Sequence, residues 1–267
     1  MSAASVDAAL KIALATIEPL AGVHVFESLP STNTWLNERD ALSTGRAEVA
    51  LALHQTAGRG RRGKTWQAPS GSGLCLSVAF QFDAMPEHPG AISLALGVSI
   101  GRVLEQLGAG EILLKWPNDL VWQDRKLGGI LVESSARGGG FRVVAGVGIN
   151  VALPAPFTLD SAQGWSKGPV DLAAMGIATT IAELAARVIP AVIDALADYE
   201  RTPLTDTMAA FNRRHWLNER PAELDGKMLR CGPVDETGRL LVVDMQNGEQ
   251  RTIDSGDVTP IAWSEAS

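Results

Sequence analysis

The stretch Gly58-Arg59-Gly60-Arg61-Arg62-Gly63-Lys64 carries more information about the protein than any other part of its 267-residue sequence. Three glycines let successive backbone N–H groups turn toward one anion, and four cationic side chains surround the same point. This combination suits a polyphosphate, or a carboxylate that meets a phosphate. It differs from the GxxxxGKS/T phosphate loop, so that nucleotide-binding fold is not implied. The alternative interpretation is a solvated basic loop that touches nucleic acid.

The segments around this loop predict an α+β fold, in which a mixed or antiparallel sheet is packed by helices. After residue 218, closely spaced short runs at 228–230, 240–243 and 250–253 predict a small β-barrel module. For the rest of the chain, apolar periodicity predicts helices at 6–20, 91–107, 179–199 and 204–216, and strands at 23–26, 49–53, 74–82, 112–116, 120–122, 126–133 and 141–151.

Lys115-Trp116-Pro117-Asn118-Asp119 joins two of the predicted strands through a rigid turn. One interpretation is that Asn118 and Asp119 simply cap this turn, which is the usual reason for such residues. The functional interpretation is that Lys115 and Asp119 help to hold a nucleotide and its magnesium ion. The segment alone favours the structural interpretation.

Two glycine-containing strand segments follow. In Lys126-Leu127-Gly128-Gly129-Ile130, a lysine beside two glycines can reach a ligand that lies directly over the backbone. The alternative is a surface lysine at the end of a hairpin. In Gly146-Val147-Gly148-Ile149-Asn150, glycine recurs with a period of two, so both glycines face one side of the strand. They form either a floor free of side chains, on which a flat ring lies, or a bulged core strand.

The composition limits the class of protein. With 46% hydrophobic and 20% charged residues, the sequence predicts a globular chain with a sizeable core. A net charge of −7 argues against a general nucleic-acid surface. Two distant cysteines, Cys75 and Cys231, predict neither a disulfide framework nor a zinc site. We find no export signal and no apolar run long enough for a membrane span, so a cytoplasmic protein without membrane contact is expected.

The order of these motifs resembles that of the biotin protein ligases. The resemblance covers residues 23–150, and the C-terminal module more loosely; the GRGRRG loop together with KWPND is highly specific to that family. It implies a catalytic domain like that of class II aminoacyl-tRNA synthetases at 1–217 and an SH3-like β-barrel at 218–267. It also implies that biotin is activated with ATP to biotinyl-5′-AMP and then transferred to a lysine of the biotin carboxyl carrier protein, a subunit of acetyl-CoA carboxylase.

The resemblance also implies roles for individual residues. Lys126 and Arg61 would be the catalytic residues, since both would meet the reacting carboxylate and the α-phosphate. The residues implied for biotin are Ser31, Thr32, Asn33, Gln55, Gly58, Arg59, Arg61, Lys126, Gly129, Gly146 and Gly148. Those implied for the nucleotide are Arg61, Arg62, Lys64, Trp66, Asn118, Asp119 and Asn150. Biotin, ATP and Mg²⁺ are expected in the reaction, with no metal ion assigned to direct protein ligands.

Two rival functions belong to the same fold family. A lipoate or octanoate ligase or transferase is disfavoured, because the GRGRRG and KWPND motifs belong to the biotin side of the family. A biotin-sensing transcriptional regulator would need a DNA-reading module, and residues 1–22 hold only about one helix. We therefore expect the form without an N-terminal DNA-binding domain and no DNA partner. A homodimer through a sheet edge is a further expectation, whereas residues 155–175 carry no pattern that predicts a function.

Overall fold

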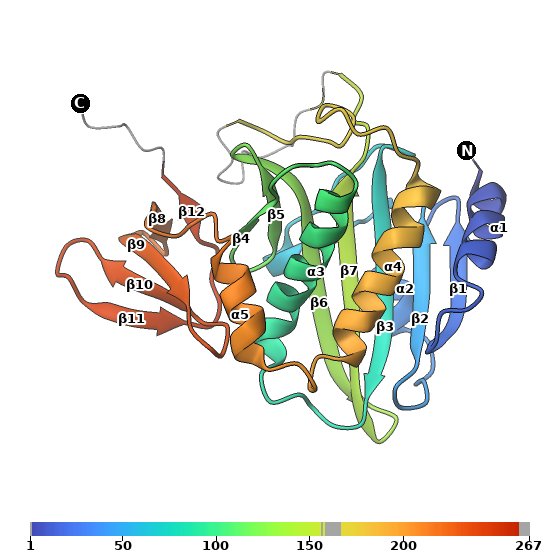
Figure 1. Ribbon diagram of the computed structural model, residues 1–267, viewed down its shortest axis with the longest axis horizontal. Coiled ribbons are helices and arrows are strands. Elements are labelled where there is room, and N and C mark those ends of the chain that lie inside the picture. Colours follow the sequence, from blue (N-terminus) through green and yellow to red (C-terminus); the bar gives the residue numbers. More distant parts are fainter. Residues whose placement is uncertain (1, 156, 158–166, 262–267) are drawn as a thin grey trace.

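A seven-stranded mixed sheet forms the centre of the protein (Figure 1). The computed structural model describes residues 2–155, 157 and 167–261. The strands lie in the order β1-β2-β3-β7-β6-β5-β4, and β1 and β2 are parallel while the other neighbours are antiparallel. Their bounds are β1 (Leu20–Phe26), β2 (Ala47–Ala52), β3 (Gly73–Phe82), β4 (Leu113–Lys115), β5 (Asp119–Trp122), β6 (Arg125–Arg137) and β7 (Gly140–Asn150).

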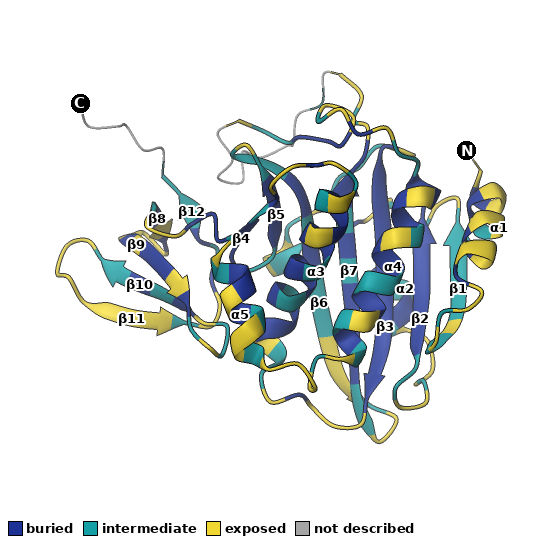
Figure 2. Ribbon diagram, in the orientation of Figure 1, coloured by how far each residue is buried: buried dark blue, intermediate teal, exposed yellow. Residues whose placement is uncertain are grey.

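Helices cover both faces of this sheet. On one face, α3 (Ile92–Gln106) and α4 (Ile181–Ala197) pack across the central strands, with α1 (Ala3–Ala13) beside α4 and α5 (Leu204–Asn212) beside α3 (Figure 1). A capping box at Thr180 starts α4, which continues through Pro190. The short α2 (Thr32–Asn37) lies on the other face. All ten residues of β3 are consequently buried, as Figure 2 shows.

The position of α2 matters because the first predicted site residues begin it. The Ser31 hydroxyl accepts a hydrogen bond from the backbone N–H of Thr34 and so caps the N-terminus of the helix. At the other end, the buried guanidinium of Arg142 on β7 donates to the carbonyls of Leu36 and Asp40 at 2.9 and 2.6 Å. These bonds from Arg142 fix the C-terminal end of the helix to the sheet.

The C-terminal residues form a separate five-stranded antiparallel sheet with the order β11-β10-β9-β8-β12. It packs against the rest of the chain: Asn212 exchanges two hydrogen bonds of 2.9 Å with the backbone of Val234, and the Trp116 indole donates to the carbonyl of Gly238 at 3.1 Å. The strands are β8 (Pro221–Leu224), β9 (Lys227–Val234), β10 (Leu240–Asp244), β11 (Gln250–Ile253) and β12 (Thr259–Pro260).

The predicted α+β class and its mixed sheet are confirmed. Strands β8 and β12 were not predicted, and other differences lie at element ends. The first helix stops at Ala13 instead of residue 20, because β1 begins at Leu20 directly after the Glu18–Pro19 peptide. The last helix stops at Asn212, because residues 214–216 leave it to pair with β4: Leu114 donates to the carbonyl of Arg214 at 2.8 Å, and Trp216 donates to that of Leu114 at 2.9 Å. Within the described residues, no helix has the length and apolarity to cross a membrane.

Candidate active site

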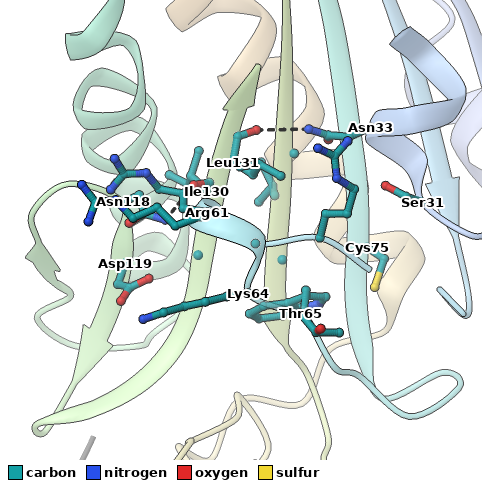
Figure 3. A pocket seen from close by; sticks show the side chains of 18 of the residues that line it. Ser31, Asn33, Arg61, Lys64, Thr65, Cys75, Asn118, Asp119, Ile130 and Leu131 are labelled. Carbon is teal, nitrogen blue, oxygen red and sulfur yellow. Dashed lines mark hydrogen bonds between the residues drawn. The ribbon is translucent and has the colours of Figure 1, made fainter. Parts of the chain in front are cut away.

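A cavity that is partly open to solvent lies on the α2 face of the large sheet. The space between its walls, open solvent at the mouth included, is about 940 Å³. Strands β3, β6 and β7 form its base, the start of α2 closes one end, and the Lys115–Asp119 turn closes the other. Figure 3 shows Ser31, Asn33 and Cys75 on one side and Asn118 and Asp119 on the opposite side.

The cavity brings together residues that are separated by more than a hundred positions in sequence. Two of the predicted site residues, Gly58 and Asn150, do not line it. Those that do are Ser31, Thr32, Asn33, Gln55, Arg59, Arg61, Arg62, Lys64, Trp66, Asn118, Asp119, Lys126, Gly129, Gly146 and Gly148.

Gly58 and Asn150 support the site from behind. A Cβ at Gly58 would lie 2.5 Å from the carbonyl oxygen of Trp66, so this glycine allows two backbone segments to approach closely. The buried Asn150 amide donates to the carbonyl of Val170 at 2.9 Å and to that of Lys126 at 3.4 Å. In this arrangement Asn150 holds the backbone next to Lys126.

A buried polar network forms the α2 end of the cavity. The Gln55 carboxamide oxygen accepts from the backbone N–H and the hydroxyl of Thr32 at 2.7 and 3.1 Å. The Thr32 hydroxyl lies 2.6 Å from that of Ser77, which in turn donates to Asn33 Oδ1 at 2.6 Å. Donors and acceptors held this way suit a neutral polar ligand group such as a urea or an amide.

The two glycines of β7 face the cavity, as their period of two predicts, but larger groups lie on them. The Asn33 amide rests against Gly146. A Cβ at Gly148 would lie 2.5 Å from Cε2 of the Trp66 indole, so the ring lies directly on the strand. Gly146 and Gly148 therefore allow Asn33 and Trp66 to approach the sheet, which corrects the expectation of a bare floor at these two positions.

Cations gather at the opposite end, around Asp119. The Lys126 ammonium lies 2.7 Å from Asp119 Oδ1, and the Lys115 ammonium lies 4.0 Å from Oδ2. Burial lowers the pKa of Lys115, and Asp119 acts in the opposite direction. Burial also lowers the pKa of Arg61, with Arg62 adding to the decrease and Asp119 and Asp257 opposing it. These groups form a concentrated positive site with an acidic centre.

Asn118 has a clear structural task within the same turn. Its side-chain amide donates to the carbonyl of Ile130 at 2.9 Å, and its own carbonyl accepts from the Ile130 N–H at 2.9 Å. Asn118 thus joins the turn to β6, and the residue also lines the cavity wall.

Residues 58–66, which we call the arginine loop, form a tight hairpin at the cavity mouth. Gly60 donates to the carbonyl of Lys64 at 2.7 Å, and Trp66 donates to that of Gly58 at 3.0 Å. Its tip, a single 3₁₀ turn at Arg61–Gly63, contains two residues with positive φ, Arg62 at 53° and Gly63 at 75°. These backbone hydrogen bonds join the two strands of the loop, so the strands and the tip form one local unit.

Comparison with known proteins places this site in a family. Residues 25–150 match the Biotin/lipoate A/B protein ligase family. The chain is 36% identical over 226 residues to the Bifunctional ligase/repressor BirA of Escherichia coli, an alignment that covers 82% of this chain and 68% of that protein. The chain belongs to the biotin protein ligase family. It is also 41% identical over 107 residues to the Biotin–[acetyl-CoA-carboxylase] ligase of Mycobacterium tuberculosis, which is 39% of each chain.

A solved structure shows the same fold. The biotin protein ligase from Aquifex aeolicus in complex with biotin and ATP aligns with a TM-score of 0.71 at 22% identity, and the alignment covers 92% of this chain and 99% of that one. The seven-stranded mixed sheet with its helices and the five-stranded C-terminal sheet match the biotin protein ligase fold. The expected fold family is therefore confirmed.

Sequence reasoning missed several residues of this biotin protein ligase site. Cys75 is buried and also lines the cavity, and burial raises its pKa to about 11. Ser77 completes the polar network, yet lies within an apolar run. Asp257, from the C-terminal sheet, faces Lys64. No local spacing signals these residues, because each acts through partners that are distant in sequence.

Proposed function

We propose that the protein activates biotin with ATP to form biotinyl-5′-AMP and transfers biotin to a lysine of a biotin carboxyl carrier protein. The observation that carries the proposal is one continuous cavity with a neutral polar network at the Thr32–Gln55 end and a cation cluster at the Lys126–Arg61 end. Biotin has a matching division, with a ureido group at one end and a carboxylate at the other. The names of the E. coli and M. tuberculosis relatives support the same activity.

The charges explain how the first step is accelerated. Attack of a carboxylate on the α-phosphate joins two anions and releases a third, so fixed cations lower the barrier most where the new charge develops. Lys126 and Arg61 line the cationic end of the cavity, and Lys64 and Arg62 lie on the same loop as Arg61. No nucleophilic side chain is required, because the carboxylate of the substrate attacks. Arg61 and Lys126 would bind and orient the two reacting groups.

Magnesium would enter with the nucleotide. The described residues contain no cluster of three or more His, Cys, Asp or Glu side chains that could hold a metal ion. The carboxylates lining the cavity are those of Asp119 and Asp257, and Mg²⁺ is commonly bound by one or two carboxylates together with substrate phosphates. Asp257 is paired with Lys64, so Asp119 would be the carboxylate that contacts a magnesium–phosphate complex, and that complex would neutralise the leaving pyrophosphate.

The second step requires that a lysine of the carrier reaches the activated carbonyl. The cavity is partly open to solvent beside the arginine loop, which would give that lysine access. We place the catalytic domain at residues 1–217 and the small C-terminal domain at 218–267, and Gly256 and Asp257 of the latter line the cavity. The C-terminal domain would thus contribute to the nucleotide end.

The test distinguishes the use of biotin from the use of lipoate or octanoate. Purified protein is incubated with ATP and biotin, lipoate or octanoate, and pyrophosphate release is measured, followed by transfer of labelled biotin to a carboxyl carrier domain. A carrier whose acceptor lysine is changed to arginine is the matched control. We expect release with biotin and labelling of the unmodified carrier alone. Preferential use of lipoate or octanoate would overturn the assignment in favour of the other branch of the family.

A further inference from the structure

The arginine loop is held from two sides by acidic residues that are distant in sequence. Arg59, on its first strand, forms an ion pair of 2.9 Å with Glu133 on β6. Lys64, on its returning strand, forms an ion pair with Asp257, in the connection between β11 and β12. Since the loop is a backbone-bonded hairpin, fixing both strands fixes the direction of its tip, where Arg61 and Arg62 lie.

Both acidic residues are themselves held in place. The Glu133 carboxylate also accepts from the amides of Asn33 and Asn37 at 2.9 and 3.2 Å, so α2 orients it. Asp257 lies between the buried Gly256 and Val258. Burial alone raises the pKa of Asp257, but the hydrogen bond from Lys64 and the neighbouring cations outweigh it and the pKa is lowered. The carboxylate is therefore charged at neutral pH.

We infer that Glu133 and Asp257 are positioning residues that hold the arginine loop over the cavity and so place Arg61 at the reacting groups. The role of Arg61 in this statement rests on the proposed function, whereas the anchoring of the loop does not. The anchors also offset part of the repulsion among the four neighbouring cations, because two of them, Arg59 and Lys64, have acidic partners within the chain. One anchor lies in the connection between β11 and β12, so the C-terminal residues act on the site through the loop.

Limited trypsin digestion of the ligand-free protein tests the anchoring directly. Cleavage after Arg61 or Arg62 requires the loop to open. When the loop closes faster than trypsin cleaves, the cleavage rate is proportional to the fraction of molecules whose loop is open. Glu133→Gln and Asp257→Asn each remove one partly exposed ion pair that stabilises the closed loop. Such pairs contribute little free energy, so we expect about 1.5- to fivefold faster cleavage for each variant. The effects of these separate anchors should multiply in the double variant.

Matched controls separate anchoring from general destabilisation. Asp254 is an exposed aspartate three positions before Asp257, and in the described part of the chain Asp254 makes no ion pair. The Asp254→Asn variant should therefore be cleaved at the wild-type rate. Cleavage after the exposed Arg230 or Arg251 serves as the internal standard for unfolding. In a Lys64→Met background, Asp257→Asn should add nothing, because its partner is already absent.

Kinetics then distinguish positioning from charge competition. Asp257→Asn should raise KM for ATP several-fold while kcat changes less, because substrate binding must close a looser loop. If Asp257 acts instead as a negative charge that competes with the phosphates, the same variant would lower KM for ATP. Equal cleavage rates in wild type, Glu133→Gln and Asp257→Asn would also overturn the inference. Because digestion needs no substrate, its result tests the anchoring of the loop independently of whether the protein uses biotin.

Discussion

The ammonium group of Lys126 lies 2.7 Å from a carboxylate oxygen of Asp119, and the two residues belong to the neighbouring strands β6 and β5. Both side chains are largely buried, with exposed fractions of 16% and 10%. The pair keeps the lysine aimed into the cavity and neutralises part of the cation cluster until an anion arrives. A substrate carboxylate or phosphate would therefore meet an oriented charge.

Lys126→Ala is expected to abolish formation of biotinyl-AMP while the protein remains folded. Removing one charge partner of the transition state costs about 2–4 kcal/mol, which is roughly a hundredfold or more in rate. Biotin-dependent pyrophosphate release measures this, and circular dichroism checks the fold. Lys227→Ala, which removes an exposed lysine on β9, should behave as wild type. Near-normal release by folded Lys126→Ala would exclude a catalytic role for this residue.

Asp119→Asn is expected to move the alkaline limb of the pH–rate profile to lower pH. Burial lowers the pKa of Lys115, and the Asp119 carboxylate opposes that decrease. Without the carboxylate the pKa falls further, so Lys115 loses its positive charge at a lower pH and phosphate binding weakens there. The profile of kcat/KM for ATP between pH 7 and 10 measures the shift. An unmoved alkaline limb would show that the charge of Lys115 does not contribute.

Gly148→Ala is expected to displace Trp66 and to impair ligand binding. The new methyl group would lie 2.5 Å from the indole ring, so the ring must move, and such overpacking costs about 1–3 kcal/mol of stability. Thermal unfolding and calorimetric titration with biotin measure the two effects. Gly101→Ala is the control, since its methyl group would meet Ile112 at an ordinary 3.7 Å. Unchanged biotin affinity in Gly148→Ala would show that the placement of Trp66 is unimportant for binding.

His215 is expected to make the protein less stable in mild acid. Burial lowers its pKa to about 4, below the value near 6.5 of an unfolded chain. Between these values the unfolded state binds more protons, so stability is lost as pH falls from 6.5 toward 4, by an amount on the order of 3 kcal/mol. Urea unfolding at pH 7 and 4.5 should show a smaller loss for His215→Gln than for wild type.

A second readout covers the case in which His215→Gln does not fold. The NMR signals of the His215 ring in the wild-type protein should not titrate between pH 7 and 5. A midpoint near 6.5 would contradict the burial argument.

Short-range sequence patterns predict most of the helices and strands, and they also predict part of the site. The turn at Pro117 and the glycine repeat in β7 follow from short-range chemistry, so the sequence predicts both hairpins and their inward residues. Element ends were less accurate, because the stop of α5 depends on a strand edge at Leu114 that lies about a hundred residues earlier.

The partners of the arginine loop could not be predicted in the same way. Its four cations are obvious in the sequence, but their acidic partners are not. Glu133 and Asp257 lie 74 and 193 positions from their partners, and neither stands in a distinctive motif. Only the folding of β6 and of the C-terminal sheet toward the same cavity brings the opposite charges together.

Residues 214–216 have a consequence for how copies of the protein can meet. An open sheet offers two unsatisfied edges, and each is a template for adding a foreign strand. At the β4 edge, Leu114 already forms backbone hydrogen bonds with residues 214–216. This segment of the same chain therefore covers that edge. The other edge is β1. A second copy that extended the large sheet would therefore align along Leu20–Phe26, on the side of the molecule away from the C-terminal sheet (Figure 1).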